Sequence, residues 1–227
     1  MKIILALCAL ALASFTASAA SFTFTGNQYG AGIANFTPPC AIPSCANFTA
    51  SMRVSGSFST STRLPANAPG TDITGILSGG SFSDGLTTYD GTDPALRVYQ
   101  FAVVTDANSN ITDEFILIER WQTGGAGPHV AGDRIDYIII GPGGATQAFH
   151  NVPCIAVGAA PSGVTDACNG VGADASQSGA AGAAGPLFAA LPGASVPTLG
   201  EYALLLLAAL MGIFGMYGVR RNGGTAA

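Results

Sequence analysis

The chain has 227 residues, of which only 9% are charged, and it contains 31 Gly and 13 Pro. Typical soluble domains have about 25% charged residues, so the composition excludes a coiled coil, a helical bundle and a charge-rich disordered chain. The net charge of −5 provides no basic surface, and we expect no nucleic-acid partner. Lys2 is the only lysine, which excludes Schiff-base chemistry and a phosphate-loop lysine.

Residues 1–19 have the layout of a secretory signal peptide. Lys2 supplies a positive start, residues 3–12 form an apolar run, and Ala17-Ser18-Ala19 is a small-x-small cleavage site. The apolar run is short for a membrane span, although a retained N-terminal anchor is the alternative. We predict that this segment directs export and is then removed.

From Ser21 to about Val157, within an expected domain of residues 20–168, apolar side chains recur with a period of two rather than 3.6. Seven strands are expected: Ser21–Thr25, Met52–Thr60, Ile73–Phe82, Leu96–Thr105, Glu114–Gln122, Ile135–Ile140 and Gln147–Val157. Clusters of Asn, Asp, Gly and Pro separate them, which is typical of an antiparallel sandwich or barrel. We predict an all-β, antiparallel β-sandwich, with a hairpin between Leu96–Thr105 and Glu114–Gln122 through the turn formers at 106–110.

Residues 169–195 consist mainly of Gly, Ala and Ser, without a periodic pattern. Such segments behave as flexible linkers. We therefore expect a tether with a reach of roughly 25–30 Å between the sandwich and the C-terminal segment.

Four cysteines remain once Cys8 leaves with the signal peptide, and an even number in an exported chain indicates disulfides. Three pairings are possible, and the local one, Cys40–Cys45 with Cys154–Cys168, is our prediction. The four lack the Cys-x-x-Cys spacing of a zinc site. We expect no metal and no cofactor.

Candidate catalytic residues are scarce. His129 and His150 are the only histidines, and no Gly-x-Ser-x-Gly motif accompanies them. The segment 106–117 begins like a calcium loop, but Ile111 replaces the required Gly and Leu117 the final Glu. We expect a turn there, no catalytic residue, and a protein that is not an enzyme.

One alternative assigns a carbohydrate site to Tyr89 and Trp121 with nearby acids at 84, 90 and 93. The same acids also suit turns, as in Ser83-Asp84-Gly85 and Asp90-Gly91, and we prefer that interpretation. The sequence thus leaves two roles open for the sandwich. It is either a structural or adhesive module, or a secreted glycan-binding module or hydrolase.

Residues 196–227 have three consecutive parts. Val196-Pro197-Thr198-Leu199 comes first, and Pro197 favours an extended backbone before it. An apolar stretch from Tyr202 to Val219 comes next, long enough as a helix to cover roughly 27 Å of bilayer. Arg220 and Arg221 come directly after it, and as basic residues they should stay on the cytoplasmic side. We predict a single transmembrane helix with Arg220 and Arg221 as its topological stop.

This arrangement resembles the IPTL-CTERM sorting signal of Gram-negative bacteria, a relative of the PEP-CTERM signals. Val196 stands for the usual Ile, Tyr202 for the usual Trp, and Ala203 for the frequent Gly. The resemblance implies transient insertion in the inner membrane, recognition of residues 196–199 by an exosortase-like enzyme, and delivery to the cell surface or extracellular matrix. A permanently anchored domain is the alternative.

The start of the exported part, Phe22-Thr23-Phe24-Thr25-Gly26, is also similar to exported domains of PEP-CTERM-type proteins. Those domains have no established activity to carry over. The resemblance implies a surface role, and it makes extracellular polysaccharide a candidate partner.

Overall fold

The computed structural model describes residues 19–40 and 45–191. The expected signal peptide up to residue 18 lies outside these residues. So does the chain from residue 192 onward, with the predicted sorting element, membrane helix and Arg220 and Arg221. Within the described residues no helix is long and apolar enough to cross a membrane.

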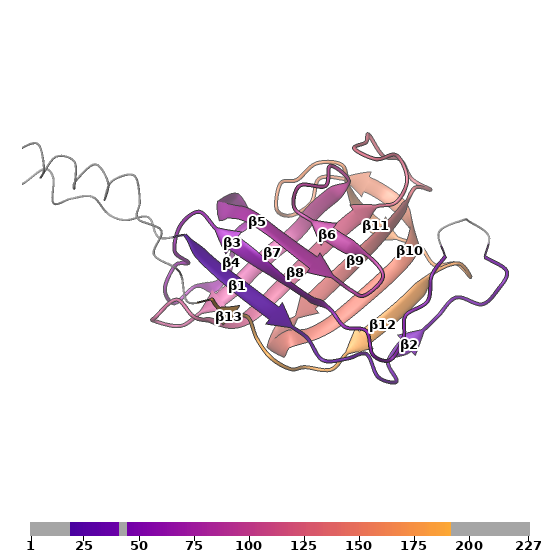
Figure 1. Cartoon of the computed structure of the whole chain (residues 1–227). Helices are drawn as coiled ribbons and strands as arrows, with labels where there is room; N and C mark the ends of the chain where they lie inside the picture. The colour runs from indigo at the N-terminus through magenta and orange to yellow at the C-terminus, as the bar shows by residue number, and fades with distance from the viewer. Residues whose placement is uncertain (1–18, 41–44, 192–227) are drawn as a thin grey trace, which may run out of the picture. The chain divides into compact units, whose positions relative to one another are not determined.

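Two antiparallel sheets form a sandwich (Figure 1). The smaller sheet has the order β13-β1-β3-β5-β6, with β1 at Ala20–Thr25, β3 at Ser55–Thr60, β5 at Leu77–Ser83, β6 at Thr88–Asp90 and β13 at Ala189–Ala190. The larger has the order β2-β12-β10-β9-β8-β7-β4, and β11 pairs with β10 off this path. Its strands are β2 Ile33–Ala34, β4 Pro69–Asp72, β7 Leu96–Thr105, β8 Ile111–Trp121, β9 Arg134–Gly141, β10 Ala145–Gly158, β11 Ala167–Val171 and β12 Ser178–Gly182. Two short 3-10 turns, η1 at Thr74–Ile76 and η2 at Pro142–Gly144, complete the elements.

The expected all-β sandwich is confirmed, and each of the seven predicted strands overlaps an observed one. The predicted hairpin joins β7 to β8, in register from Leu96↔Arg120 to Thr105↔Ile111. Its turn depends on Asp106, whose Oδ1 accepts the backbone N–H groups of Asn108 and Asn110 at 2.8 Å each. These bonds explain the Asp-x-Asn-x-Asn spacing as turn chemistry.

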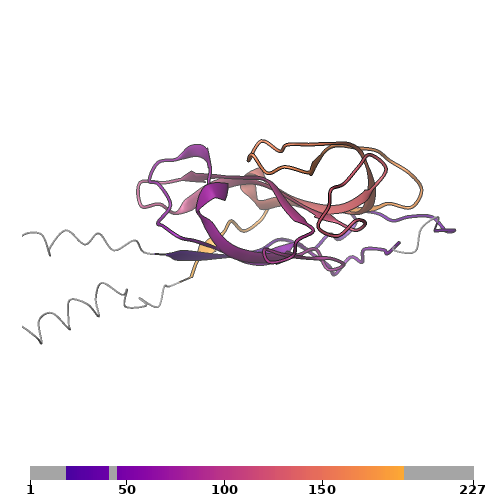
Figure 2. The same cartoon turned by 90° about the horizontal axis from the view of Figure 1, so that it is seen from above.

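The main core lies between the sheets, which Figure 2 shows edge on. Its buried members are mostly aromatic on the smaller sheet and β-branched on the larger, and include Phe22, Phe24, Phe58, Phe82, Phe101, Ile116, Ile118, Ile138 and Ile140. The ring of Phe58 on β3 stacks on Phe22 at 4.9 Å and meets Phe101 on β7 edge-on at 4.7 Å. Phe58 therefore connects the two layers.

The expected tether over residues 169–195 is wrong for its described part. The segment contains the end of β11 and all of β12 and β13, and β12 lies between β10 and β2 in the larger sheet. Phe188 is 6% exposed, with its ring 5.0 Å from Phe24 and 5.1 Å from Phe58. The Gly and Ala content reflects close packing, since a Cβ at Gly182 would come within 2.5 Å of Thr146 Oγ1. β12 alternates buried and more exposed positions with small side chains, a pattern that large-residue periodicity does not detect.

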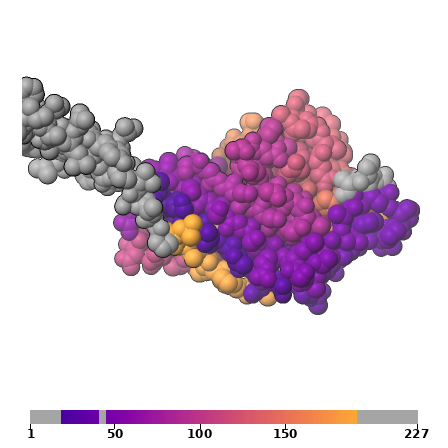
Figure 3. All heavy atoms as spheres, in the orientation of Figure 1, coloured from indigo at the N-terminus to yellow at the C-terminus, as the bar shows by residue number. Residues whose placement is uncertain are grey.

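The two ends of the described domain lie side by side. β13 pairs with β1, and the Leu191 N–H donates to the Ser21 carbonyl at 2.8 Å. β13 is the edge strand of the smaller sheet and β1 is its neighbour. The smaller sheet faces the viewer in Figure 1 and in the space-filling view of Figure 3. β1 begins at Ala20, directly after the predicted signal cleavage site. Four residues, 192–195, separate Leu191 from Val196.

Both predicted disulfides are present. Cys40 and Cys45 have Cα atoms 6.0 Å apart, and Cys154 and Cys168 have Cα atoms 5.8 Å apart. The second joins β10 to β11 and belongs to a separate buried cluster on the outer side of the larger sheet. That cluster consists of Ala95, Trp121, Ile135, Val152, Cys154 and Cys168.

Candidate functional site

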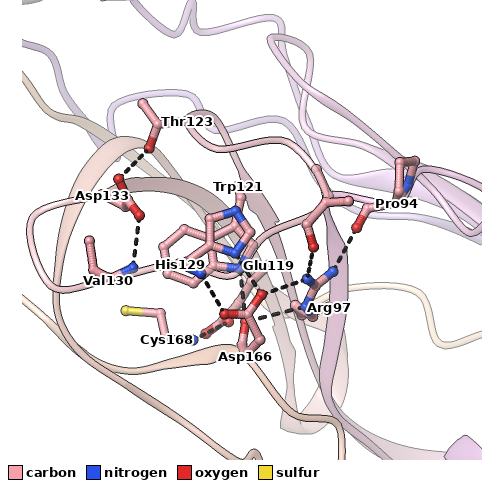
Figure 4. Close-up of polar contacts among 12 residues, drawn as sticks. Pro94, Arg97, Glu119, Trp121, Thr123, His129, Val130, Asp133, Asp166 and Cys168 are labelled. Atoms are coloured by element: carbon pink, nitrogen blue, oxygen red, sulfur yellow. Dashed lines mark hydrogen bonds and ion pairs between the residues drawn. The ribbon is translucent and has the colours of Figure 1, made fainter.

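A polar cluster gathers around Asp166, within the loop that the Cys154–Cys168 disulfide closes (Figure 4). Asp166 has a left-handed backbone with a φ of 61°. Its carboxylate accepts the backbone N–H of His129 and the Nη2 of Arg97, both at 2.8 Å. It also lies 2.7 Å from His129 Nδ1. Burial alone would raise the pKa of Asp166, but these hydrogen bonds and charges lower it to about 2.

Trp121 forms the apolar side of the same cluster. Its indole ring stacks on the His129 imidazole, with centroids 4.0 Å apart and planes 5° apart. Its Nε1 donates to the Asp166 carbonyl at 3.0 Å. Arg97 also donates to the carbonyls of Pro94 and Ala126. The cluster thus ties the loops before His129 and before Cys168 to the ends of β7 and β8.

The two histidines each have a carboxylate neighbour but differ in surroundings. His150 Nδ1 lies 2.9 Å from Asp136 Oδ1. The His129 Nε2 is buried and has no hydrogen-bond partner among the described residues, so no described nucleophile contacts it. In the described ranges no three His, Cys, Asp or Glu residues lie together as metal ligands would. The hydrogen bonds of the Asp166 cluster form a polar clamp between loops.

The structure does not bring together the two aromatic residues suggested for a carbohydrate site, because Tyr89 lies in the main core and Trp121 in the second buried cluster. Each is 1% exposed, and Asp84 is fully buried. Tyr89 donates from its hydroxyl to Asp84 Oδ2 at 2.9 Å, while Asp84 Oδ1 accepts the N–H groups of Leu86 and Thr87 at 2.7 Å. Burial is the main reason that the pKa of Asp84 is raised. The polar groups of Tyr89 and Asp84 thus bind each other and the backbone of the turn at 84–87.

The acids at 90 and 93 serve turns, as the preferred interpretation predicts. Asp90 Oδ1 accepts the Thr92 N–H at 2.8 Å and the Thr92 hydroxyl at 2.7 Å. Asp93 Oδ1 accepts the Ala95 N–H at 2.9 Å, and its Oδ2 pairs with Arg120 Nε at 2.7 Å. These bonds fix the chain between β6 and β7.

A different region of the surface is hollowed. Between the outer face of the larger sheet and β11 lies a hollow of about 220 Å³ whose lining includes Tyr99, Glu119, Tyr137 and Asn169. Glu119 is 3% exposed, and its Oε2 accepts the Cys168 N–H at 2.9 Å. Burial raises the pKa of Glu119 to about 7. Burial and the neighbouring Glu119 charge raise the pKa of Tyr137 to about 12.

A second hollow, of about 270 Å³, lies beside Phe149 and is lined by residues 34–37, Asp174, Gln177 and Gly179 among others. Phe149 stacks on Tyr137 with centroids 4.6 Å apart, so one aromatic pair borders both hollows. Asp174 forms an ion pair with Arg134.

Sequence reasoning missed the residues of these hollows because their grouping depends on strand register. Glu119 and Tyr137 are direct cross-strand partners, and Tyr137 is in turn the partner of Phe149. The period-two pattern places such residues on outward positions, but it does not say which strands are neighbours. Only Trp121 among the predicted aromatic ligands lies near this face, and it is buried.

The predicted sorting residues Val196, Pro197, Thr198, Leu199 and Tyr202, and the predicted stop at Arg220 and Arg221, lie outside the described residues. Comparison with known protein families matches residues 194–221 to the IPTL-CTERM motif. No curated protein and no solved structure matches the chain. The chain therefore carries an IPTL-CTERM sorting signal, which implies processing by a sorting enzyme, after a β-sandwich domain with two disulfides.

Proposed function

We propose that the chain is exported across the inner membrane of a Gram-negative cell, held there transiently by its apolar segment, and cut by an exosortase-like transpeptidase. The observation that carries this proposal is the IPTL-CTERM match at 194–221. Residues 196–199 are the recognition element, Leu204 to Gly218 is the retention helix, and Arg220 with Arg221 stops transfer.

The domain itself supports export. Two disulfides are typical of an oxidising compartment. The first strand starts at Ala20, so removal of residues 1–19 leaves β1 intact. The last described strand ends at Ala190, and only a few residues then precede the match at 194. A compact domain placed directly before a sorting signal suits retention at the cell surface.

We assign the sandwich a structural or adhesive role rather than catalysis. The His129–Asp166 pair is held by Arg97 and covered by Trp121, and it connects loops. In this account the nucleophile of the sorting reaction belongs to the sorting enzyme, and the present chain is the substrate.

The test is deletion of residues 196–227 in a host that has the sorting enzyme. We expect the truncated domain to be exported and then lost to the periplasm or medium, while the full chain stays with the surface or matrix. Surface retention equal to that of the full chain would contradict the proposal. The permanently anchored alternative predicts that the full chain remains in the inner-membrane fraction.

A further inference from the structure

The outer face of the larger sheet has an ordered arrangement of side chains. Strand register places Arg97, Glu119, Tyr137 and Phe149 in one row across β7, β8, β9 and β10. The neighbouring row consists of Gln100, Leu117, Ile139 and Gln147. Residues in a row share a face and lie about 4.5–5.5 Å apart at Cβ. Aromatic, amide and carboxyl groups thus lie together on a rigid surface, outside the main core.

The first hollow offers hydrogen-bonding groups that the protein does not use. The hydroxyls of Tyr99 and Tyr137 have no hydrogen-bond partner among the described residues. Glu119 uses one oxygen for the Cys168 N–H. Asn169 donates from Nδ2 to the Ala159 carbonyl at 3.1 Å, which leaves its side-chain oxygen as an acceptor. These groups line a hollow that also contains the apolar side chains of Leu117 and Ile139.

The second hollow continues the surface on the other side of the Tyr137–Phe149 stack. The Gln177 Oε1 that belongs to it is buried and has no partner among the described residues. Its charged member, Asp174, is balanced by Arg134. Asn35 is engaged by both backbone groups of Phe48 at 2.9 Å, so it serves the fold.

We propose that this outer face binds a neutral oligosaccharide, which lies over the Tyr137–Phe149 stack and reaches into both hollows. A sugar ring has apolar C–H faces and hydroxyl groups at its edges. The outer face of the larger sheet has aromatic rings beside hydrogen-bond donors and acceptors, so the two are complementary. Several donors and acceptors of the hollows lack a partner among the described residues, and a ligand rich in hydroxyl groups can form hydrogen bonds with them.

The charges on the face favour a neutral over an anionic ligand. Arg97 is the cation of the row, and its guanidinium is occupied by Asp166 and by the carbonyls of Pro94 and Ala126. Glu119 becomes negative as the pH rises past about 7, and an anionic polysaccharide would then be repelled. This inference deepens the proposed surface role, and it is measured on purified protein, so its failure would leave the sorting proposal standing.

The experiment uses the full chain, purified in lauryldimethylamine oxide because glycoside detergents would compete. The chain is applied to an array of neutral hexose and pentose oligosaccharides and of uronic-acid oligosaccharides. The best neutral hexasaccharide is then titrated by calorimetry. We expect Tyr99→Ala and Glu119→Gln each to weaken binding about tenfold or more, as for residues at the centre of a contact. Tyr137→Phe, which removes one hydroxyl, should weaken it by a smaller factor.

Val130→Ala is the matched control, because Val130 is 64% exposed and lines neither hollow. Near-ultraviolet circular dichroism should show that all four variants keep the native fold. The inference is supported if the wild type binds neutral sugars, the Tyr99 and Glu119 variants bind them more weakly, and Val130→Ala binds them as the wild type does. No binding to any neutral sugar, binding only to uronic acids, or equal binding by all variants would overturn it.

Discussion

The two faces of the larger sheet differ in the side chains that they carry. The inner face buries Ile116, Ile118, Ile138 and Ile140 against the phenylalanines of the smaller sheet. The outer face has a disulfide, the Asp166 clamp and two hollows. Tyrosines and the buried Glu119 line the first hollow, and Phe149 lines the second. Strand alternation sends neighbouring residues to opposite sides, so one set of strands serves both.

This difference shows where stability and binding are located. Buried apolar contacts between the sheets stabilise the fold because they remove large apolar areas from water. Polar groups on the outer face are kept in fixed positions by the β10–β11 hairpin and by loops tied to it. Substitutions on the inner face of the larger sheet should therefore mainly change stability. Substitutions of polar residues on its outer face should change stability less and ligand binding more.

The largest effect is expected for Phe188→Ala, which tests whether residues beyond 182 belong to the inner core. Phe188 packs on Phe24 and Phe58, and truncation of a buried phenylalanine costs about 3–5 kcal/mol. Chemical denaturation measures the change in the free energy of unfolding. Leu191→Ala is the control, since Leu191 is 47% exposed and should change stability by no more than about 0.5 kcal/mol. Equal, small effects for both would mean that the segment does not pack.

Removal of the outer-face disulfide should come next. Replacing Cys154 and Cys168 together by Ala should lower the free energy of unfolding by about 3 kcal/mol, from loop-closure entropy over roughly 15 residues. The Cys40 and Cys45 pair closes a shorter loop, so its replacement should cost less. Thermal unfolding of both double variants compares the two. A larger loss for the Cys40 and Cys45 variant would contradict this ranking.

Glu114 is an acid in the inner region, and its titration gives a pH dependence. It is 2% exposed, and burial together with the charge of Asp113 raises its pKa to about 7. A raised carboxyl pKa means that its full stability is present below the ordinary value near 4.5 and is lost as the pH rises through about 7. Glu114→Gln should remove this loss and raise stability at pH 8 by at most about 3 kcal/mol. Unfolding curves at pH 4.5 and 8 measure it, and parallel pH profiles for variant and wild type would refute it.

The smallest effect is expected for the clamp on the outer side. The pKa of Asp166 is lowered to about 2, so its stabilisation is present above the ordinary value near 3.8 and is lost as the pH falls toward 2. Asp166→Asn should cost about 1–2 kcal/mol at neutral pH, typical of charged hydrogen bonds. It should also flatten the acid limb of the stability profile. A variant that loses stability between pH 4 and 2 as steeply as the wild type would show that the clamp contributes nothing.

The sequence predicted the parts of the fold that local patterns determine. Large β-branched and aromatic residues with a period of two located seven strands between Phe22 and Val157, and short spacing located both disulfides. The short strands β2, β4 and β6 in the same range were missed. The sequence failed at Ser178–Gly182, because a strand of Ser, Gly and Ala packs by closeness of backbones rather than by apolar bulk. It also failed to group Glu119 with Tyr137 and Phe149, because pairing register depends on non-local contacts.

The sorting account is tested most directly by the intact mass of the exported protein, recovered from cells that have the sorting enzyme. We predict a mature chain that starts at Ala20 and ends within or next to residues 196–199, without the apolar segment and Arg220–Arg221. The Pro197→Ala variant should accumulate in the uncut form, because residue 196 would lose its preference for extended backbone. A wild-type mass that includes all residues through Ala227 would contradict cleavage and would favour a permanently anchored domain.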